Sequence, residues 1–570
     1  MMRKQILWNS DWLFARGDTP EKATPVTLPH TWNAKDGQDG GNDYYRGTCL
    51  YTKAFEAPDH SDSEEVWLEF EGVAMTAVVT LNGQELARHE GGYATFRVNL
   101  TPALAAQNTL TVAVDNGKNR TVYPQKADFT FYGGIYRPVH LLVVPKAHFA
   151  LDYHGAPGLR ITPVLSADLK TAEIHAEAWV AGTAQSVQFT LGEETLSAPV
   201  TDGKAECTFK LENVHLWDGV NDPYLYKMQA TLDSGDAVEA NFGCRTIAFD
   251  AEKGFILNDR PYRLCGAARH QDRQGLGNAL TEKEHDEDMA LLREMGANTV
   301  RLAHYQHAQY FYDLCDKYGL VAWAEIPYLT EHIPEGRANT LSQMTELVVQ
   351  NYNHPSIVCW GLSNEITGSG KTEDLVENHK LLNDLCHKLD ATRPTTMAHI
   401  FMLDANDPLV FLPDIRSYNL YYGWYVGEWD QNDAWFDEFH KNHPDAVIGL
   451  SEYGADANPA YVKAGGEVVN WFDRADEIVK EGYFSIKDSM GDVKAHPQAS
   501  AVLNELIAPL QAKAAAAYGD VAKNIQIPES MQRMMDKMSV EATLKQMGKL
   551  VTPAFVHELN AALNQVKKEG

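Results

Sequence analysis

The most constraining feature of this sequence is a regular alternation of short apolar runs and helical stretches between residues 255 and 454. Amphipathic segments such as "TEKEHDEDMALLREMGA" (281–297) separate the runs. Such alternation builds a parallel sheet, so we predict a (β/α)8-type barrel, with a doubly wound sheet as the alternative and an eighth strand not evident. Seven runs have the length and composition of strands: "FILNDRPYRLCG" (255–266), "NTVRLAHY" (298–305), "LVAWAEIP" (320–327), "IVCWGLSNE" (357–365), "PTTMAHI" (394–400), "DIRSYNLYY" (414–422) and "AVIGLSEYG" (446–454).

Two β-rich regions precede this series. Residues 1–145 contain short alternating runs such as "TAVVTLNG" (76–83), and residues 146–248 repeat the pattern with runs such as "AEIHAEAWV" (172–180). Regular spacing of short strands and turns is typical of β-sandwiches. We therefore predict a β jelly-roll sandwich over residues 1–145 and an immunoglobulin-like β-sandwich over residues 146–248.

The remaining sequence divides into the barrel, predicted over residues 249–475, and a helical C-terminal segment over residues 476–570. In "ASAVLNELIAPLQAKAAAAYG" (499–519) and "TPAFVHELNAALNQVKKEG" (552–570) the apolar residues fall at helical spacing. Apolar stripes of this kind usually form the core of a small bundle, and a partner-binding face is the alternative.

Charge and cysteine content exclude several classes of protein. The 570 residues carry a net charge of −29, which disfavours binding to nucleic acid or to an anionic membrane surface. Seven scattered cysteines form no CxxC pair, which argues against a zinc ribbon or a disulfide framework and fits a reducing compartment. The N-terminal residues contain no apolar region of signal-peptide length, and no run of 18 apolar residues occurs, so we expect a cytoplasmic location.

Polar side chains close most of the predicted strands. Because the carboxyl ends of barrel strands meet at one face, and because buried charge is costly unless it is paired or used, these residues predict one active site. The residues, in chain order, are His270, Arg301, His304, Glu325, Asn364, Glu365, Asn419, Tyr421 and Glu452.

Two glutamates at the ends of non-adjacent strands suit the cleavage of a glycosidic bond. One, protonated, gives a proton to the leaving oxygen, while the other, ionised, attacks the anomeric carbon. A separation of about 5–5.5 Å between the carboxyl groups would retain the configuration of the sugar. The sequence offers Glu365 in "GLSNEI" and Glu452 in "GLSEYG" for these two roles.

At this point the motifs resemble glycoside hydrolase family 2, over roughly residues 1–458. The resemblance is carried by "YYRGTCLYTKAF" and "DFTFYGGIYRPVHL" in the first predicted domain and by "LWDGVNDPYLY" in the second. In the barrel it is carried by "GAARHQDRQGLGNAL", "MGANTVRLAHYQH", "NHPSIVCWGLSNE", "NLYYGWY" and "GLSEYGAD". The resemblance implies a sugar-binding jelly roll, an immunoglobulin-like sandwich, a catalytic barrel and retaining hydrolysis of a terminal β-linked sugar.

The resemblance also assigns residues. By position, Glu365 matches the acid/base of the family and Glu452 matches its nucleophile. Asn364 would bind the sugar 2-hydroxyl, and Tyr421 would lie beside the nucleophile. The remaining predicted substrate-binding residues are His270 and His304, which would line the sugar pocket, Asp128, which would reach it from the jelly-roll loop "ADFTFYGG", and Arg301 at the end of its strand.

The motif "RHQDR" (269–273) resembles the β-galactosidases of the family more than its β-glucuronidases, so we expect a small terminal β-D-galactoside as substrate. A β-glucuronidase or a β-mannosidase of the same chemistry is the alternative. After residue 458 the sequence departs from the family, which normally supplies an eighth strand there. "VVNWFD" (468–473) resembles that strand superficially, but it is more similar to the start of a helical C-terminal tail, so we interpret the departure as a missing internal segment. The alternative is that Trp471 serves the eighth strand after a shortened loop. An incomplete barrel also leaves a catalytically impaired carbohydrate-binding remnant open.

Glycosidic cleavage by two acids requires no organic cofactor, so we expect none. Some members of the family use a magnesium or sodium ion near the acid/base, but no ligands for one are evident in this sequence. A homo-oligomer is compatible with the sequence, which does not specify an oligomeric state.

Overall fold

The computed structural model divides the chain into two compact units, which are described separately. The first unit comprises Met1–Ile366, Lys371–Ala398 and Pro408–Arg416, and the second comprises Thr367–Gly370, His399–Asp407 and Ser417–Gly570. No helix in the described ranges is both long and apolar enough to cross a membrane. The structure describes residues 3–38, 44–425, 428–454, 480, 482–518, 535–545, 551 and 553–568.

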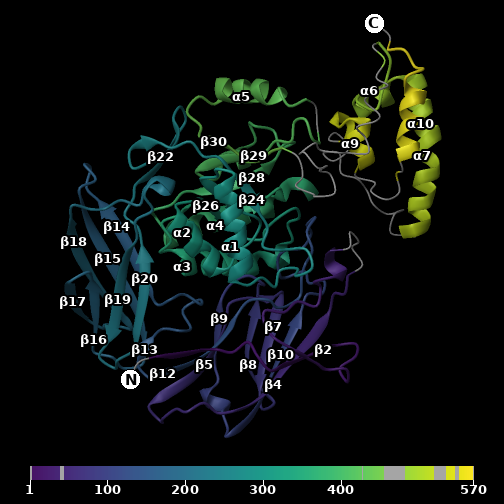
Figure 1. Cartoon of the computed structure of the whole chain (residues 1–570). Helices are drawn as coiled ribbons and strands as arrows, with labels where there is room; N and C mark the ends of the chain where they lie inside the picture. The colour runs from purple at the N-terminus through teal and green to yellow at the C-terminus, as the bar shows by residue number, and fades with distance from the viewer. Residues whose placement is uncertain are drawn as a thin grey trace. The chain divides into compact units, whose positions relative to one another are not determined.

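The first domain is a sandwich of two antiparallel sheets, with strand orders β1-β12-β5-β9 and β3-β2-β4-β10-β7-β8 (Figure 1). Alternating residues of the two sheets face one core, which contains Trp12, Tyr51, Phe70 and Val112. This agrees with the predicted jelly roll. The strands, with the short pair β6 and β11, are β1 Lys4–Leu7, β2 Trp12–Arg16, β3 Thr24–Val26, β4 Thr48–Glu56, β5 Glu64–Phe70, β6 Val73–Ala74, β7 Thr76–Leu81, β8 Gln84–Glu90, β9 Phe96–Asn99, β10 Gln107–Asp115, β11 Gly134–Ile135 and β12 Val139–Pro145.

The second domain is a smaller sandwich, in which β14, β15 and β18 pack against the sheet β17-β16-β19-β20. Phe149, Phe189 and Phe209 are fully buried between these sheets. Its strands are β13 His148–Phe149, β14 Leu159–Leu165, β15 Thr171–Ala181, β16 Ser186–Leu191, β17 Glu194–Pro199, β18 Lys204–Glu212, β19 Tyr226–Leu232 and β20 Ala237–Phe242.

The predicted first barrel strand, residues 255–266, is wrong. These residues form part of an antiparallel three-stranded sheet of β21 (Ile247–Asp250), β22 (Gly254–Leu257) and β23 (Arg260–Pro261). Asn258 and Asp259 both have positive φ, 51° and 61°, and make the tight turn between β22 and β23. The first parallel strand is instead β24 (Gly266–Arg269), which begins where the predicted strand ends.

The barrel predicted from the alternating pattern contains a parallel sheet whose strand order follows the chain from β24 to β30. β27 is buried along its whole length, as expected for a strand covered on both faces. Its strands after β24 are β25 Thr299–Leu302, β26 Val321–Glu325, β27 Ile357–Asn364, β28 Thr395–Ile400, β29 Ile415–Asn419 and β30 Ile448–Glu452. The helices between them are α1 Glu282–Glu294, α2 Gln309–Tyr318, α3 Arg337–Asn351, α4 Glu373–Leu389 and α5 Gln431–Asn442.

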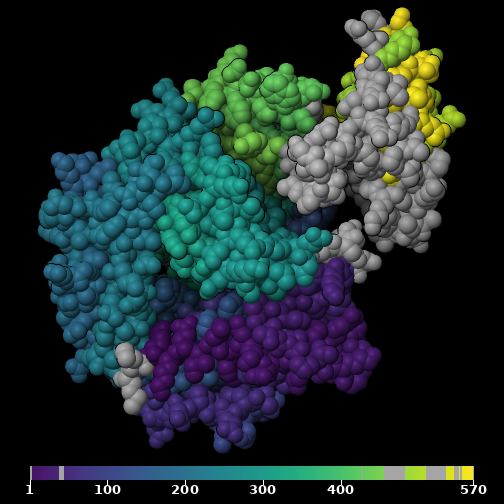
Figure 2. Space-filling view, viewed as in Figure 1, coloured from purple at the N-terminus to yellow at the C-terminus, as the bar shows by residue number. Residues whose placement is uncertain are grey.

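Buried amides of α3 attach the first sandwich to the barrel, and the two lie directly against each other in Figure 2. Asn339 accepts a hydrogen bond from the N–H of Tyr123 (2.9 Å) and donates one to the carbonyl of Glu90 (2.9 Å). Gln350 accepts from the N–H of Thr95 (3.1 Å) and donates to the carbonyl of the same residue (2.9 Å). These hydrogen bonds give partners to backbone N–H and C=O groups of the sandwich that the interface shields from water.

The C-terminal helices form a small core of their own, as the apolar stripes predict. Ile486, Leu503, Leu559 and Leu563 are buried together in it. The helices are α6 Met490–Ala495, α7 Pro497–Tyr518, α9 Val540–Lys545 and α10 Pro553–Leu563. The segment proposed to supply or lack an eighth strand, residues 456–480 with "VVNWFD", lies almost entirely outside the described residues.

Replacing Gln350 tests the attachment of the sandwich. In Gln350→Ala the buried N–H and C=O of Thr95 lose their partner, so the free energy of unfolding should fall by about 3 kcal/mol. Thermal unfolding followed by circular dichroism measures the change. The matched control, Gln188→Ala on the exposed face of β16, should leave the midpoint unchanged. Equal midpoints for the two variants would contradict this role of Gln350.

Candidate active site

A buried ion pair lies at the carboxyl ends of β25 and β26. Arg301 donates to both oxygens of Glu325, from Nε at 3.0 Å and from Nη2 at 2.9 Å. The side chain of Arg301 is only 6% exposed and that of Glu325 only 1%. Two charges this deeply buried are tolerated because each hydrogen-bonds to the opposite charge. Burial alone would raise the pKa of Glu325, but Arg301 and a hydrogen bond with His304 outweigh it and lower that pKa.

The same arginine positions the residue before the predicted acid/base. Nη2 of Arg301 donates a hydrogen bond to Oδ1 of Asn364 at 2.9 Å. The N–H of Asn364 donates to the carbonyl of Tyr328 (3.0 Å). Asn364 is therefore fixed by its side chain and its backbone.

Glu365 adopts a backbone conformation that is uncommon for a residue other than glycine. Its φ is 46°, in the left-handed region, and its N–H donates to the carbonyl of Ala398 at 2.8 Å. Such a conformation costs of order 1–3 kcal/mol and persists where the surroundings enforce it, as happens at functional sites. It turns the chain out of β27 immediately after Asn364, at the residue predicted to transfer the proton.

Two histidines lie beside this network. Nδ1 of His304 is 2.7 Å from Oε1 of Glu325, and Nδ1 of His270 is 3.2 Å from the hydroxyl of Tyr305. Burial, with a smaller contribution from His304, lowers the pKa of His270 to about 3. His270 is therefore a neutral hydrogen-bonding group at pH 7, as the sugar-pocket assignment requires.

The jelly-roll loop reaches these histidines through an aromatic residue that the sequence interpretation did not include. The ring of Phe129 lies 5.0 Å from that of His270 and 6.1 Å from that of His304. Asp128, the residue predicted from this loop, is exposed next to Phe129. The aromatic pair in "DFTF" was the available signal, since an apolar ring at a loop tip usually packs against a neighbour.

In the second unit, the structure brings Tyr421 and Glu452 together as predicted. The hydroxyl of Tyr421 donates a hydrogen bond to the carboxylate of Glu452, the last residue of β30. The N–H of Leu420 donates to the carbonyl of Glu452 (2.9 Å), and the hydroxyl of Ser451 donates to Oδ1 of Asn419 (2.7 Å). The carboxylate of Glu452 is thus held at a strand end by a side chain from the neighbouring segment.

The first unit also contains a strongly cationic cavity of about 670 Å³. Asp115 and Glu331 are the acidic residues in its lining. Because the chain as a whole is acidic, this concentration of positive charge marks a place suited to an anionic ligand. The basic residues that line it are Arg46, Arg88, Lys118, Arg120 and Lys126.

Three family models match successive parts of the chain. They are described as the glycosyl hydrolase 2 galactose-binding domain-like model (residues 43–153), the glycosyl hydrolases family 2 model (residues 157–245) and the glycosyl hydrolases family 2 TIM barrel domain (residues 250–475). These matches fall on the two sandwiches and on the parallel sheet.

Among known proteins, a β-glucuronidase of Bacteroides fragilis is 37% identical over 496 residues, which are 80% of this chain and 69% of the relative. A β-galactosidase of Thermoanaerobacter pseudethanolicus is 29% identical over 451 residues, covering 74% of this chain and 58% of that protein. The crystal structure of an FMN-binding β-glucuronidase from Facaelibacterium prausnitzii L2-6 has a TM-score of 0.78 and 39% identity, with 82% of this chain and 74% of that chain covered.

The matched domains follow one another in the order of the observed sandwiches and parallel sheet, and the strand-end glutamates of that sheet lie within the matched barrel. The resemblance inferred from the motifs is thereby confirmed at the level of the family. This chain belongs to glycoside hydrolase family 2 and is a glycosidase of that family.

Proposed function

We propose that this chain is a retaining exo-glycosidase that removes a terminal β-linked sugar, and that β-glucuronides are its preferred substrates. The observation that carries the mechanism is the hydrogen bond from Tyr421 to the carboxylate of Glu452, because it orients an ionised acid at the end of a strand. The conformation of Glu365 beside the fixed Asn364 supports a second, separately oriented acid.

In the first step of the proposed reaction, Glu452 attacks the anomeric carbon while Glu365 protonates the leaving oxygen, so that a glycosyl-enzyme forms and the aglycone departs. In the second step Glu365 removes a proton from water, which attacks the same carbon and releases Glu452. Tyr421 holds the carboxylate of Glu452 in one orientation through its hydroxyl. We assign Asn364, His270, His304, Arg301 and Asp128 to the binding and positioning of sugar hydroxyls.

The choice of sugar rests on the relatives and on charge. The β-galactosidase expected from "RHQDR" is not confirmed, because the 37% identical relative and the structure with 39% identity are both named β-glucuronidases. A sugar carboxylate needs a cationic partner, and Lys126, two residues before Asp128 in the jelly-roll loop, is the candidate for it. The β-galactoside remains the second candidate because of the β-galactosidase relatives.

Removing either acid should separate the two roles. Glu452→Gln should lower kcat roughly 10⁴-fold on every substrate, because no covalent intermediate can form. Glu365→Gln should lower kcat by about 10²–10⁴-fold on poor leaving groups, and less on nitrophenyl glycosides that depart without a proton. Steady-state kinetics with both kinds of substrate measure this.

The control for this pair is Glu294→Gln, which changes an exposed glutamate of α1 and should leave kcat unchanged. Turnover that survives Glu452→Gln would refute the assignment of the nucleophile. An unmodified chain without turnover on any β-glycoside would instead favour the carbohydrate-binding remnant.

Tyr421→Phe removes the phenol hydroxyl that holds Glu452 and keeps the ring. Because a hydrogen bond to a charged group contributes about 1.5–3 kcal/mol, kcat should fall about 10–100-fold. Tyr425→Phe is the matched control, because its ring lies 4.9 Å from that of Tyr421 and it is 38% exposed. A loss of equal size in both variants would contradict a specific role of the Tyr421 hydroxyl.

A panel of p-nitrophenyl β-glycosides tests the sugar. We expect the highest kcat/KM for the glucuronide, and the variant Lys126→Ala should raise KM for the glucuronide about tenfold while leaving the galactoside unaffected. The galactoside is the internal control, because it has no carboxylate. A higher kcat/KM for the galactoside or the mannoside would overturn the substrate assignment and leave the two-acid mechanism intact.

A further inference from the structure

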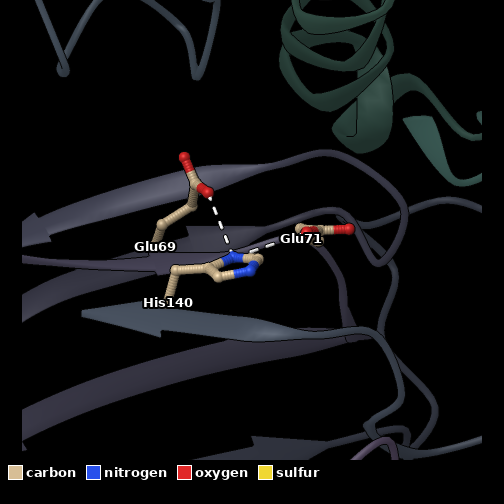
Figure 3. A group of neighbouring side chains, drawn as sticks. All are labelled: Glu69, Glu71 and His140. Atoms are coloured by element: carbon tan, nitrogen blue, oxygen red, sulfur yellow. Dashed lines mark ion pairs between the residues drawn. The ribbon is translucent and has the colours of Figure 1, made fainter. Parts of the chain in front are cut away.

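Outside the glycosidase site, three ligand-type side chains converge on the face of the first sandwich that points away from its core (Figure 3). His140 on β12 lies directly opposite Glu69 on β5, and Glu71 follows Glu69 by two residues, on the same face. The intervening Phe70 points into the core. The cluster therefore consists of one cross-strand pair, His140 and Glu69, and of Glu71 just after the end of β5. The pairing of the two strands fixes the distances between these side chains.

The distances within the cluster do not correspond to hydrogen bonds. Nδ1 of His140 lies 3.4 Å from Oε1 of Glu69 and 3.4 Å from Oε1 of Glu71. Good N–H···O hydrogen bonds measure about 2.7–3.2 Å. The ring nitrogen is shielded from solvent and has no hydrogen-bond partner, although two carboxylates face it. A buried polar atom left in this state requires an explanation.

A tetrahedral cation explains both distances. Zinc binds imidazole nitrogen at about 2.0–2.1 Å and carboxylate oxygen at about 2.0–2.2 Å, and ligand atoms at those bond lengths are about 3.4 Å apart at tetrahedral angles. The two nitrogen–oxygen distances match this edge, and all three ligand atoms lie within 4.8 Å of one another. Three protein ligands leave the fourth position of a zinc ion for water.

The surroundings are arranged as a second layer around such an ion. Nε of Arg97, opposite Glu69 on β9, donates to Oε2 of Glu69 at 2.6 Å, which leaves Oε1 directed at the cluster. The carboxylate of Glu71 is the third ligand group and comes from the residue that follows β5. Glu282 and Arg137 also act on Glu71 and have opposite charges.

A second histidine–carboxylate cluster shows the contrast. Nδ1 of His354 is 2.6 Å from Oδ2 of Asp316, and Oδ1 of Asp316 accepts from the N–H of Ser356 at 3.0 Å. Asp313 stands further away, at 4.0 Å from the same ring nitrogen. There the ring nitrogen is satisfied by a short hydrogen bond, and the cluster needs no ion.

We propose that Glu69, Glu71 and His140 form a binding site for a divalent transition-metal cation of the zinc type, which clamps the end of β5 to β12. The competing occupant is a proton on His140. Because the ligand atoms must be deprotonated to bind a metal, acid should displace it.

The test is isothermal titration of the chelator-treated full chain with ZnCl₂ at pH 7.5. We expect one high-affinity equivalent, weakened at least 100-fold in Glu71→Gln and in His140→Gln, and weakened progressively between pH 7 and pH 5.5. Co²⁺ in place of Zn²⁺ should give the intense visible absorption of a tetrahedral centre, and both variants should lose it. Circular dichroism of the metal-free variants checks that they are folded.

His175→Gln is the matched control, because His175 is also a strand histidine with a glutamate nearby, at 3.9 Å, and its titration should equal that of the unmodified chain. Zinc affinity unchanged by Glu71→Gln and His140→Gln, or absent from the unmodified chain, would overturn the site. In that case His140 is a protonated ion-pair partner of the two glutamates.

Discussion

The buried pair of Arg301 and Glu325 is the interaction on which the rest of the barrel end depends. It joins the ends of β25 and β26, and through Asn364 it extends to β27. Glu325 in turn orients His304. Breaking such a pair leaves an uncompensated buried charge, which typically costs 3–5 kcal/mol, so the network is kept or lost as a unit.

The first sandwich completes this arrangement. Its loop places Phe129 against His270 and His304, and Tyr123 is anchored to α3 by Asn339. The exposed Asp128 is therefore carried by a loop that is fixed on both sides. A side chain that is exposed yet attached to rigid backbone can bind a ligand without first losing much conformational freedom, which lowers the cost of binding.

Much of this architecture follows from the sequence, because periodicity reports burial. The alternating runs of the sandwiches and the apolar barrel strands are visible for that reason. The prediction of a barrel strand at residues 255–266 is wrong for two reasons. Asn258-Asp259 between two apolar runs indicates a hairpin. The first parallel strand, "GAAR" (266–269), is short and contains no large apolar residue. The pairing of Arg301 with Glu325 and the approach of Phe129 depend on register and domain docking, which no local pattern encodes.

The net charge of the chain affects the binding of a macromolecule and of a small substrate differently. A charge of −29 disfavours a polyanion, which would contact a broad surface. At physiological salt, however, the field of exposed charges decays over about 8 Å, so a single sugar responds only to the groups around its own pocket. The overall acidity of the chain therefore does not count against an anionic sugar.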